Sequence, residues 1–215
     1  MIKPLQKILS ALRKRQGTTM LEEFRLKYTP FQILVSTVMS ARTKDTTTIP
    51  IAHRLFRKYK TPKDFVKIPR NTLEKIIYGI GFYRTKAGYI KKLSEIIINK
   101  YNNKVPSEIN ELLTLPGVGR KTANCVLCYA FRKPAIPVDV HVHRISNRIG
   151  LVNTKTPEET EQKLMKLVPK KYWMDINELF VTHGQTICLP RKPRCAICPI
   201  TRWCDYYKHY KQLKL

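Results

Sequence analysis

Apolar side chains recur three and four positions apart along most of this chain, which is the spacing of one face of an α-helix. The repeat is clear in five segments, whose apolar residues are Leu5, Ile8, Leu9 and Leu12; Phe31, Leu34, Val35, Val38 and Met39; Leu73, Ile76, Ile77 and Ile80; Tyr89, Ile90, Leu93, Ile96 and Ile97; and Ile109, Leu112 and Leu113. The period-two alternation of strands is nearly absent. The pattern therefore predicts an all-α fold.

Hydroxyl side chains and prolines mark where several of these helices begin. Thr29 precedes Pro30 and Thr61 precedes Pro62, and each pair joins a capping hydroxyl to a proline at the first helical position. Ser107 is expected to cap the helix that follows it. These signals divide the polypeptide into many short helices, with no low-complexity linker between them.

Charge narrows the choice of partner. The 215 residues contain 41 Lys and Arg against 15 Asp and Glu, a net charge of +26. Such a surface attracts polyanions and releases their counterions on binding, which makes nucleic acid the leading partner. A solvated basic surface without a partner and an anionic membrane surface are the alternatives. No apolar run is long enough to span a bilayer, so we expect no membrane insertion.

The N-terminal segment has no uninterrupted apolar stretch of signal-peptide length. We therefore expect a cytoplasmic, DNA-associated protein. In such a reducing compartment, cysteines are more often metal ligands than disulfide partners.

Four cysteines fall in one short window near the C-terminus, with the spacing C-x6-C-x2-C-x5-C. They are Cys188, Cys195, Cys198 and Cys204. Four thiolates are a complete ligand set for a [4Fe–4S] cluster or for one tetrahedral zinc ion. Spacing alone leaves both metals open.

The segment between the first two of these cysteines is basic. It contains Arg191, Lys192 and Arg194. A metal-bound loop that directs such side chains outward would form an ordered platform for an anion.

Two other pairs resemble metal ligands but have a simpler interpretation. Cys125 and Cys128 lie inside a predicted helix, where small buried thiols are expected. His141 and His143 are two positions apart, so on a helix they point to different faces and do not chelate one ion. We expect them to be structural or to face DNA.

The segment LPGVGRKTA predicts a helix-hairpin-helix. Its turn consists of Pro116, Gly117, Val118 and Gly119, in which the glycines permit a tight bend and a close approach to a partner. Exposed amides at the start of the next helix would bind a DNA phosphate without reading sequence. A simple interhelical turn is the alternative. GIGFYRTKAGYI shows a weaker version of the same pattern.

Lys121 lies in the first turn of the helix after this hairpin, beside Arg120. The helix dipole and the neighbouring cation both disfavour its ammonium form, and a neutral amine can form a Schiff base. Simple pairing with a DNA phosphate is the alternative role. Lys86, after the weaker glycine turn, is a competing nucleophile. Asp139 fits both an N-cap and a carboxylate that assists an amine.

The motifs LPGVGRKTA, VDVHVHRISNR, HGQTIC and C-x6-C-x2-C-x5-C together resemble those of the endonuclease III family of DNA glycosylases. The resemblance extends from about Leu34 to Tyr206. It implies a six-helix barrel domain at residues 23–134 that contains the hairpin. It also implies a cluster domain formed by residues 1–22 and 135–215, with a DNA cleft between the two domains.

The resemblance also assigns chemistry to residues. It implies that Lys121, not Lys86, is the catalytic lysine and that Asp139 is the catalytic aspartate. It implies a [4Fe–4S] cluster on the cysteine set, namely Cys188, Cys195, Cys198 and Cys204. The cluster is expected to be structural and to position DNA.

Expected DNA contacts come from three places. The hairpin supplies Gly117–Gly119, and the cluster loop supplies Lys192 and Arg194. The segment SARTKD resembles a family segment that wedges into the gap left by a flipped base, which places Arg42 there. Several relatives carry Gln at that position. Val140 stands where the family more often has Thr, a change that should preserve activity.

The implied activity is that of a monomeric, bifunctional DNA N-glycosylase and AP lyase. It would act on double-stranded DNA with an oxidised pyrimidine or an abasic site and cleave the strand by β-elimination. Three alternatives remain at the level of sequence. One is a mismatch glycosylase that removes uracil or thymine opposite guanine. The second is a non-enzymatic DNA-binding module that keeps the hairpin and the cluster, and the third is a DNA-binding protein stabilised by zinc.

Overall fold

The structure is a computed structural model that describes residues 4–14 and 19–212, with side chains up to 209. Across these residues it contains helices and no strand, so the predicted all-α fold is confirmed. The elements are α1 (Leu5–Arg13), α2 (Met20–Lys27), α3 (Pro30–Ser40), α4 (Asp45–Lys58), α5 (Pro62–Lys67), α6 (Arg70–Ile76), α7 (Tyr83–Tyr101), α8 (Ile109–Leu112), α9 (Arg120–Phe131), α10 (Val140–Arg148), α11 (Pro157–Leu167), η1 (Lys170–Tyr172), α12 (Trp173–Thr186), η2 (Cys195–Ile197), η3 (Thr201–Trp203) and α13 (Asp205–Gln212).

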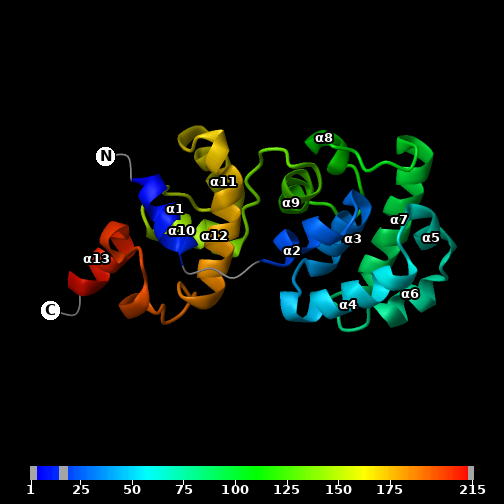
Figure 1. Ribbon diagram of the computed structural model, residues 1–215, viewed down its shortest axis with the longest axis horizontal. Helices are drawn as coiled ribbons and strands as arrows, with labels where there is room; N and C mark the ends of the chain where they lie inside the picture. The colour runs from blue at the N-terminus through cyan, green and yellow to red at the C-terminus, as the bar shows by residue number, and fades with distance from the viewer. Residues whose placement is uncertain (1–3, 15–18, 213–215) are drawn as a thin grey trace. The chain divides into compact units, whose positions relative to one another are not determined.

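The chain divides into two compact units (Figure 1). One combines Met1–Thr19 with Pro134–Leu215 and contains α1 and α10 to α13; we call it the terminal unit. The other is Met20–Lys133, which contains α2 to α9; we call it the central unit. The expected domain boundaries followed residues 22 and 134, three and one positions after these divisions. The assignment of a barrel and a cluster domain stays a prediction.

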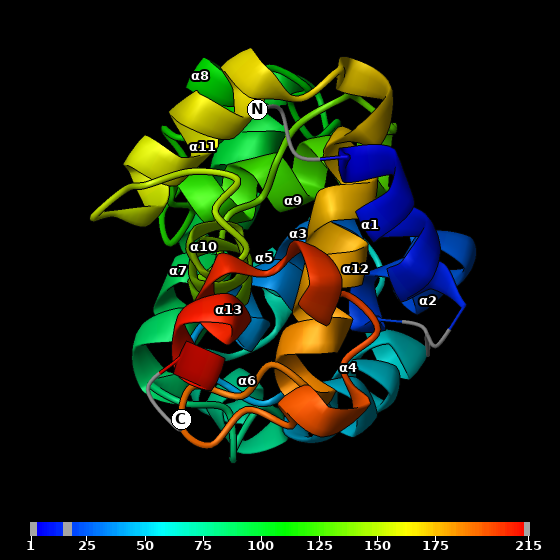
Figure 2. The ribbon, with the colours of Figure 1, turned by 90° about the vertical axis from the view of Figure 1, so that its left-hand side faces the viewer.

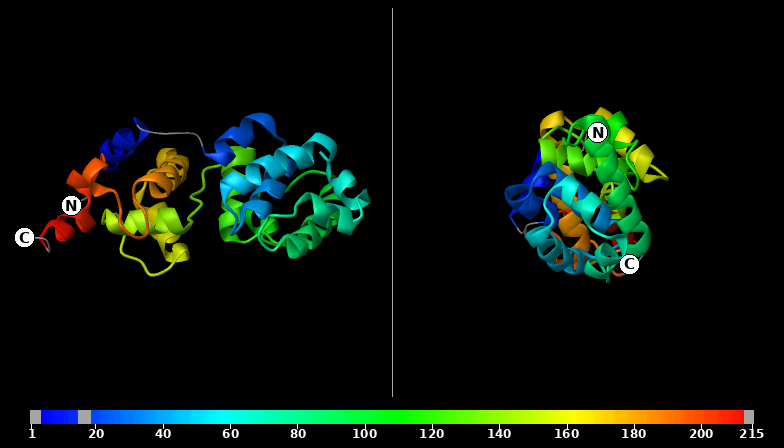
Figure 3. Two further views of the ribbon diagram at one scale, coloured as in Figure 1. Left: turned by 90° about the horizontal axis from the view of Figure 1, so that it is seen from below. Right: turned by 90° about the vertical axis from the view of Figure 1, so that its right-hand side faces the viewer.

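Helix α3 is the core helix of the central unit. Every residue from Phe31 to Met39 is buried, as expected of a helix that neighbours surround on all sides. It packs against α9, α4 and α7 (Figures 1 and 3). Its buried hydroxyls are satisfied internally, since Ser36 Oγ and Thr37 Oγ1 each donate to the carbonyl four residues earlier. The burial of α3 on all sides explains the long apolar pattern around Leu34.

The predicted Thr-Pro helix starts are confirmed. Thr29 caps α3 and Thr61 caps α5, and each forms a reciprocal capping box with the third residue of its helix. Pro30 and Pro62 occupy the first helical positions. These caps satisfy backbone amides that would otherwise have no partner inside the helix.

The predicted Ser107 cap is wrong. The N-cap of α8 is Glu108, and its side chain accepts no capping hydrogen bond. Ser107 instead accepts two hydrogen bonds from Lys133 Nζ, at 2.7 Å to its carbonyl oxygen and 3.0 Å to its hydroxyl. A lysine distant in sequence therefore occupies the oxygen that capping would have used.

The terminal unit has its own core. Helix α12 packs against α1 and α10, and α10 packs against α11 (Figure 2). The predicted apolar face of α1 is confirmed, because Ile8, Leu9 and Leu12 are all buried in this core. Residues from the two ends of the sequence therefore share one hydrophobic cluster. No helix in the described part of the chain is long and apolar enough to cross a membrane.

Candidate functional site

The predicted hairpin forms between α8 and α9. Gly117 has a φ of +77°, and a Cβ there would lie 2.7 Å from Tyr89 Cδ2. Both facts make glycine necessary at this position. Gly119 differs, because a Cβ there would meet no atom within 4 Å. Its glycine therefore leaves open, exposed surface directly before the first turn of α9.

Val118 supports this turn from within. Its side chain is buried, and its backbone N–H donates to Leu115 O at 3.1 Å. Of the three hairpin residues expected to contact DNA, the two glycines are exposed and Val118 is not. The structure thus places Val118 as an anchor of the hairpin.

The two candidate lysines occupy very different environments. Lys121 is the second residue of α9 and is partly exposed. Lys86 lies on α7 and is only 6% exposed. Burial lowers the pKa of Lys86 to about 8, and its Nζ donates hydrogen bonds to backbone and side-chain oxygens. An amine in that position is not accessible to a sugar carbon, so the geometry favours Lys121 as the nucleophile.

Asp139 caps α10, as predicted. Its Oδ1 accepts hydrogen bonds from His141 N at 2.8 Å and Val142 N at 2.9 Å. Both bonds end on the same oxygen, so within the described residues Oδ2 takes no part in the cap. The cap fixes the carboxylate at the start of α10 and leaves one oxygen for other chemistry.

Asn177 is a supporting residue that the sequence analysis missed. It is buried on α12, and its Nδ2 donates to Pro137 O at 2.7 Å. Pro137 lies two residues before Asp139, so this bond fixes the backbone that leads into the capped helix. An asparagine within an apolar helix is a signal that could have identified it.

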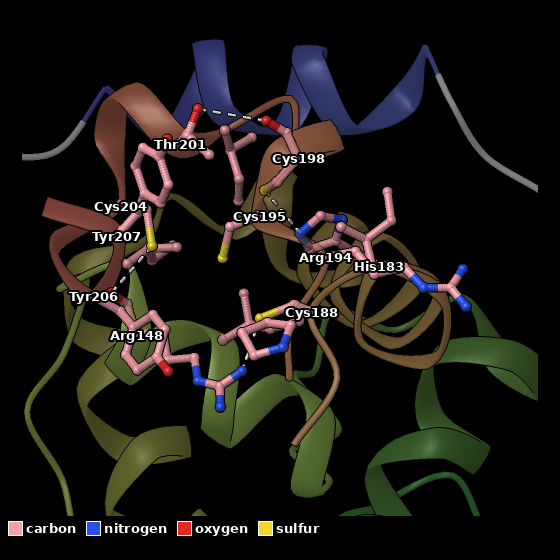
Figure 4. Close-up of a pocket in the computed structure, with 15 residues that line it drawn as sticks. Arg148, His183, Cys188, Arg194, Cys195, Cys198, Thr201, Cys204, Tyr206 and Tyr207 are labelled. Atoms are coloured by element: carbon pink, nitrogen blue, oxygen red, sulfur yellow. Dashed lines mark hydrogen bonds between the residues drawn. The ribbon is translucent and has the colours of Figure 1, made fainter. Parts of the chain in front are cut away.

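The four C-terminal cysteines line a single pocket in the terminal unit (Figure 4). Cys188 follows α12, Cys195 begins η2, Cys198 follows η2, and Cys204 lies between η3 and α13. All four are free thiols, and their sulfur atoms point toward a common space. The structure therefore brings together the complete predicted ligand set.

The chemistry of this pocket suits a cationic metal centre. Burial raises the pKa of Cys195 and Cys204, and raises that of Cys198 to about 11. Thiols in such a site become thiolates only when a cation compensates their charge. Among residues 4–14 and 19–212, no three Cys, His, Asp or Glu side chains are arranged to hold one metal ion. Four thiol side chains around one pocket are the donor type of both a [4Fe–4S] cluster and a zinc site.

Two arginines on α10 hold the first cysteine and its loop, and neither was predicted from sequence. Arg148 Nη1 donates to Cys188 Sγ at 3.3 Å and to Leu189 O at 2.7 Å. Arg144 Nη2 donates to Cys188 O at 2.8 Å and Gly184 O at 3.0 Å. Their spacing of four residues, one helical turn, places both on the face of α10 that meets this loop.

His183 is a further neighbour of the pocket that the sequence analysis missed. Its Nε2 lies 3.6 Å from Cys198 Sγ, and the side chain is buried on α12. Burial, reinforced by the charge of Arg144, lowers the pKa of His183 to about 4. The imidazole is therefore neutral at physiological pH and adds no charge beside the sulfurs.

The basic loop reaches the edge of this pocket at Pro193 and Arg194. Arg191, Lys192 and Arg194 are all exposed. Lys192 has a φ of +50°, and Arg194 lines the edge of the pocket. The loop thus presents cations to solvent, and Arg148 binds the start of its backbone at Leu189 O and Pro190 O.

Arg42 lies in the turn between α3 and α4. It is exposed and has a φ of +54°. Its Cζ is 5.9 Å from the ring centre of Phe82, which is itself 64% exposed with a φ of +58°. Phe82 was not among the predicted site residues, although it follows Gly81 in the weaker glycine motif.

The two additional ligand-like pairs are structural. Cys125 and Cys128 are buried at 0% and 1% exposure, so their prediction as core thiols is confirmed. His143 Nδ1 bonds to Thr160 Oγ1 at 2.6 Å, while His141 Nδ1 bonds to Arg144 at 3.0 Å. The two histidines therefore serve different contacts.

The fold and these sites define a class. Residues 35–170 match the family model described as "HhH-GPD superfamily base excision DNA repair protein". The chain belongs to this superfamily of base excision DNA repair proteins. Membership places it among the DNA glycosylases and AP lyases.

Named relatives narrow the assignment. The chain is 48% identical to "Endonuclease III" of Thermotoga maritima over 83% of its own length and 84% of the relative's. It is 43% identical to "Endonuclease III" of Bacillus subtilis, covering 81% and 80% of the two chains. Within the superfamily it therefore falls in the endonuclease III family.

Solved structures agree. A trapped endonuclease III–DNA covalent intermediate superposes with a TM-score of 0.85 and 37% identity, covering 96% of this chain and 97% of the other. A thermostable thymine-DNA glycosylase superposes with a TM-score of 0.82 and 31% identity, covering 95% of each chain. Proteins with two different names in this superfamily therefore share this backbone.

Proposed function

We propose that this protein is a bifunctional DNA N-glycosylase and AP lyase that removes oxidised pyrimidines from double-stranded DNA. The observation that carries the proposal is the position of Lys121. It lies in the first turn of the helix after an exposed hairpin, whereas the rival Lys86 is buried. A covalent endonuclease III–DNA intermediate among the structural relatives supports a covalent step between protein and DNA.

In the proposed reaction, the damaged nucleotide leaves the base stack, which costs a few kcal/mol and less at a lesion. The neutral amine of Lys121 attacks C1′ of the deoxyribose, and the base departs with the C1′–N bond electrons and a proton. The lone pair of the secondary amine then expels O4′, which leaves with the C1′–O4′ bond electrons and takes up a proton, so the opened sugar carries a protonated Schiff base that acidifies C2′. Removal of a C2′ proton then expels the 3′ phosphate by β-elimination.

Asp139 has two tasks in this scheme. The bonds to its Oδ1 hold the carboxylate at the start of α10. In the proposed chemistry the carboxylate stabilises the cationic sugar as the base departs and accepts a proton from the lysine. These roles need a negative charge, which separates them from the capping role.

DNA binding in the proposal uses backbone and cations. The open surface at Gly119 and the exposed Gly117 let a phosphate approach the start of α9. The exposed loop with Lys192 and Arg194 provides a second phosphate contact. A net charge of +26 adds a strong dependence on salt.

We infer a [4Fe–4S] cluster as the resident group of the cysteine pocket. Cys188, Cys195, Cys198 and Cys204 would hold it, and it would supply four cationic iron sites that keep the thiols deprotonated. Arg148 then fixes the ligand loop that presents the DNA-facing cations. Iron and sulfide analysis of the purified protein tests this inference, and one zinc ion per chain without iron would contradict it.

The decisive experiment is borohydride trapping on a duplex with thymine glycol or an abasic site. Wild type should form a covalent complex, and Lys121→Gln should form none. Lys121→Arg is the matched control, because it keeps the cation for phosphate binding but offers no nucleophilic amine. We expect Lys121→Arg to bind DNA and not to trap. Trapping by Lys121→Gln would move the nucleophile elsewhere.

A mismatch glycosylase is the second candidate, favoured by the superposition with a thymine-DNA glycosylase. Duplexes with thymine glycol, with thymine opposite guanine and with uracil opposite guanine separate the two. We expect thymine glycol to have the largest kcat/KM. Preference for the mismatches would support the second candidate, and binding without excision of any base would indicate a non-enzymatic module.

A further inference from the structure

Lys86 is a buried cation that the proposed chemistry leaves without a task. It lies on the inner face of α7 and is 6% exposed. Its Nζ donates three hydrogen bonds, to Met39 O at 2.8 Å, to Ala41 O at 2.5 Å and to Thr43 Oγ1 at 3.3 Å. An ammonium group has three protons, so each of them has an acceptor.

All three acceptors belong to the segment that ends α3 and leads into α4. Met39 and Ala41 contribute carbonyl oxygens from the end of α3, where helical carbonyls lack partners within the helix. A cation at this end is also favoured by the helix dipole. Lys86 therefore binds the C-terminal end of α3, where the chain turns toward α4.

The residue enclosed by these contacts is Arg42. It is exposed, and its φ of +54° is a conformation that side chains other than glycine rarely adopt. Such a residue persists only where its surroundings determine the backbone. Bonds to the carbonyl of Ala41 before it and the hydroxyl of Thr43 after it provide that determination.

A second element completes the restraint. Gly81 N donates to Thr43 Oγ1 at 3.0 Å, so this hydroxyl is held from two directions. A Cβ at position 81 would lie 3.0 Å from Arg42 O, which leaves little room for the turn to shift. The turn of residues 41–43, which we call the Arg42 turn, is thus bound by the segment that begins α7.

We propose that Lys86 is a positioning residue that pre-orders the Arg42 turn for insertion into duplex DNA. The inference rests on the proposed function and on the expectation from sequence that this turn enters the gap left by a flipped nucleotide. It assigns the buried lysine of the weaker glycine motif to substrate engagement and assigns no covalent step to it.

The physical reason is the free energy of ordering. A turn that is already fixed need not be ordered when DNA binds, whereas a loose turn must be ordered at the same time as the base stack is opened. The effect of Lys86 should therefore appear only where a nucleotide must be extracted from a duplex. An abasic site in single-stranded DNA requires no such extraction.

Lys86→Met removes the donors and keeps the length of the side chain. The measurement is the rate of strand cleavage at an abasic site in duplex DNA, divided by the rate at the same site in a single strand. We expect this ratio to fall about tenfold in Lys86→Met. Equal losses on the two substrates would show that the lysine serves only the fold, and would overturn the proposal.

Lys91 provides a matched control on the same helix. Its Nζ also donates to three oxygens, the carbonyls of Phe65, Val66 and Ile68 at 3.1, 2.7 and 2.6 Å, but these lie at the end of α5. Lys91→Met should lower stability and leave the cleavage ratio unchanged. A similar fall in both variants would indicate a general effect of loosening the central unit.

Thr43→Val serves if Lys86→Met does not fold. It removes the hydroxyl that both Lys86 and Gly81 contact, at a half-buried position. We expect the ratio to fall by a few-fold, because the bonds from Lys86 to Met39 O and Ala41 O remain. An unchanged ratio would count against the proposal. This variant keeps the charge of Lys86 in the core, so the test does not depend on removing that charge.

A double-mutant cycle links Lys86 to Arg42. If the lysine acts through this turn, Arg42→Ala alone should lower the ratio, and Lys86→Met should add little to it. Additive losses, or an Arg42→Ala variant with the ratio of wild type, would overturn the proposal.

Borohydride trapping by wild type on the single strand is scored separately, so failure of the Lys121 chemistry is distinguishable from failure of this inference.

Discussion

Two regions of the central unit look alike in sequence and differ in role. In each, a glycine turn leads into a helix with a lysine near its start: Gly79 and Gly81 before α7, and Gly117 and Gly119 before α9. The lysine of the first is the fourth residue of its helix and is buried against backbone oxygens. The lysine of the second is the second residue of its helix and is partly exposed.

The difference teaches that the position of a lysine relative to the start of its helix determines whether its amine is buried or exposed. The fourth position of α7 precedes Ala87 and belongs to the face that contains the buried Ile90. The second position of α9 precedes that helix's buried run, which starts at Thr122. A shift of two residues relative to the helix start therefore separates a buried lysine that binds backbone oxygens from a partly exposed lysine that we propose as the nucleophile.

The largest expected effect tests this contrast directly. Lys121→Gln should lower strand cleavage by roughly 10³-fold or more, because no other group replaces the nucleophile. Lys86→Gln should keep full trapping on single-stranded abasic DNA. Gel-resolved cleavage products measure the loss in Lys121→Gln, and gel-resolved borohydride complexes measure trapping by each variant. A loss of trapping in both variants would erase the distinction between the two turns.

Asp139, at the start of α10, allows a capping role to be separated from a role in the reaction. Asn caps helices as well as Asp, so Asp139→Asn should leave the free energy of unfolding nearly unchanged. It should reduce turnover by about 10²-fold or more, because the charge is lost. Asp139→Ala should in addition lose about 1 kcal/mol of stability. Single-turnover kinetics and urea unfolding separate these effects, and a fully active Asp139→Asn would leave only the cap.

The pH dependence of stability measures the burial of Lys86. Burial lowers its pKa from 10.5 to about 8, so between these values the unfolded chain binds a proton that the folded chain has released. The free energy of unfolding of wild type should therefore rise relative to Lys86→Met as the pH rises from 8 to 10.5. The gain is about 3 kcal/mol at most. Urea titrations across this range measure it, and a flat difference would mean that the lysine is solvated.

The two hairpin glycines give the smallest contrast. Gly117→Ala should lower the free energy of unfolding by about 2 kcal/mol, because it combines a positive φ with a contact of 2.7 Å to Tyr89. Gly119→Ala should change stability by less than about 0.5 kcal/mol, since its Cβ would enter open space. It should weaken DNA binding instead. Unfolding curves and duplex titrations distinguish the two, and equal destabilisation would contradict the assignment.

Features that depend on a few consecutive residues could be predicted from the sequence. The capping boxes at Thr29 and Thr61, the cap at Asp139 and the apolar face of α1 all arise within one or two helical turns. The four cysteines could be grouped because they lie in a single short window. In each case the partner atoms are close in sequence.

Features that depend on distant partners could not be predicted. The Ser107 cap failed because Lys133, 26 residues away, takes its oxygens. The burial of Lys86 depends on carbonyls 45 and 47 residues earlier. The contact of Arg148 with Cys188 spans 40 residues. Side-chain patterns along one helix contain no information on which backbone oxygens a distant segment will present.

The shared core of α1 and the C-terminal helices has a consequence for synthesis of the protein. Leu9 packs in one cluster with Phe180 and Cys204, so the first helix has no complete partner surface until the last part of the chain has emerged from the ribosome. At 5–20 residues per second this delay is roughly 10 to 40 s. The central unit, whose residues are contiguous, can fold during that time. Any group that the four cysteines hold must therefore be assembled last, on a chain whose other half is already folded.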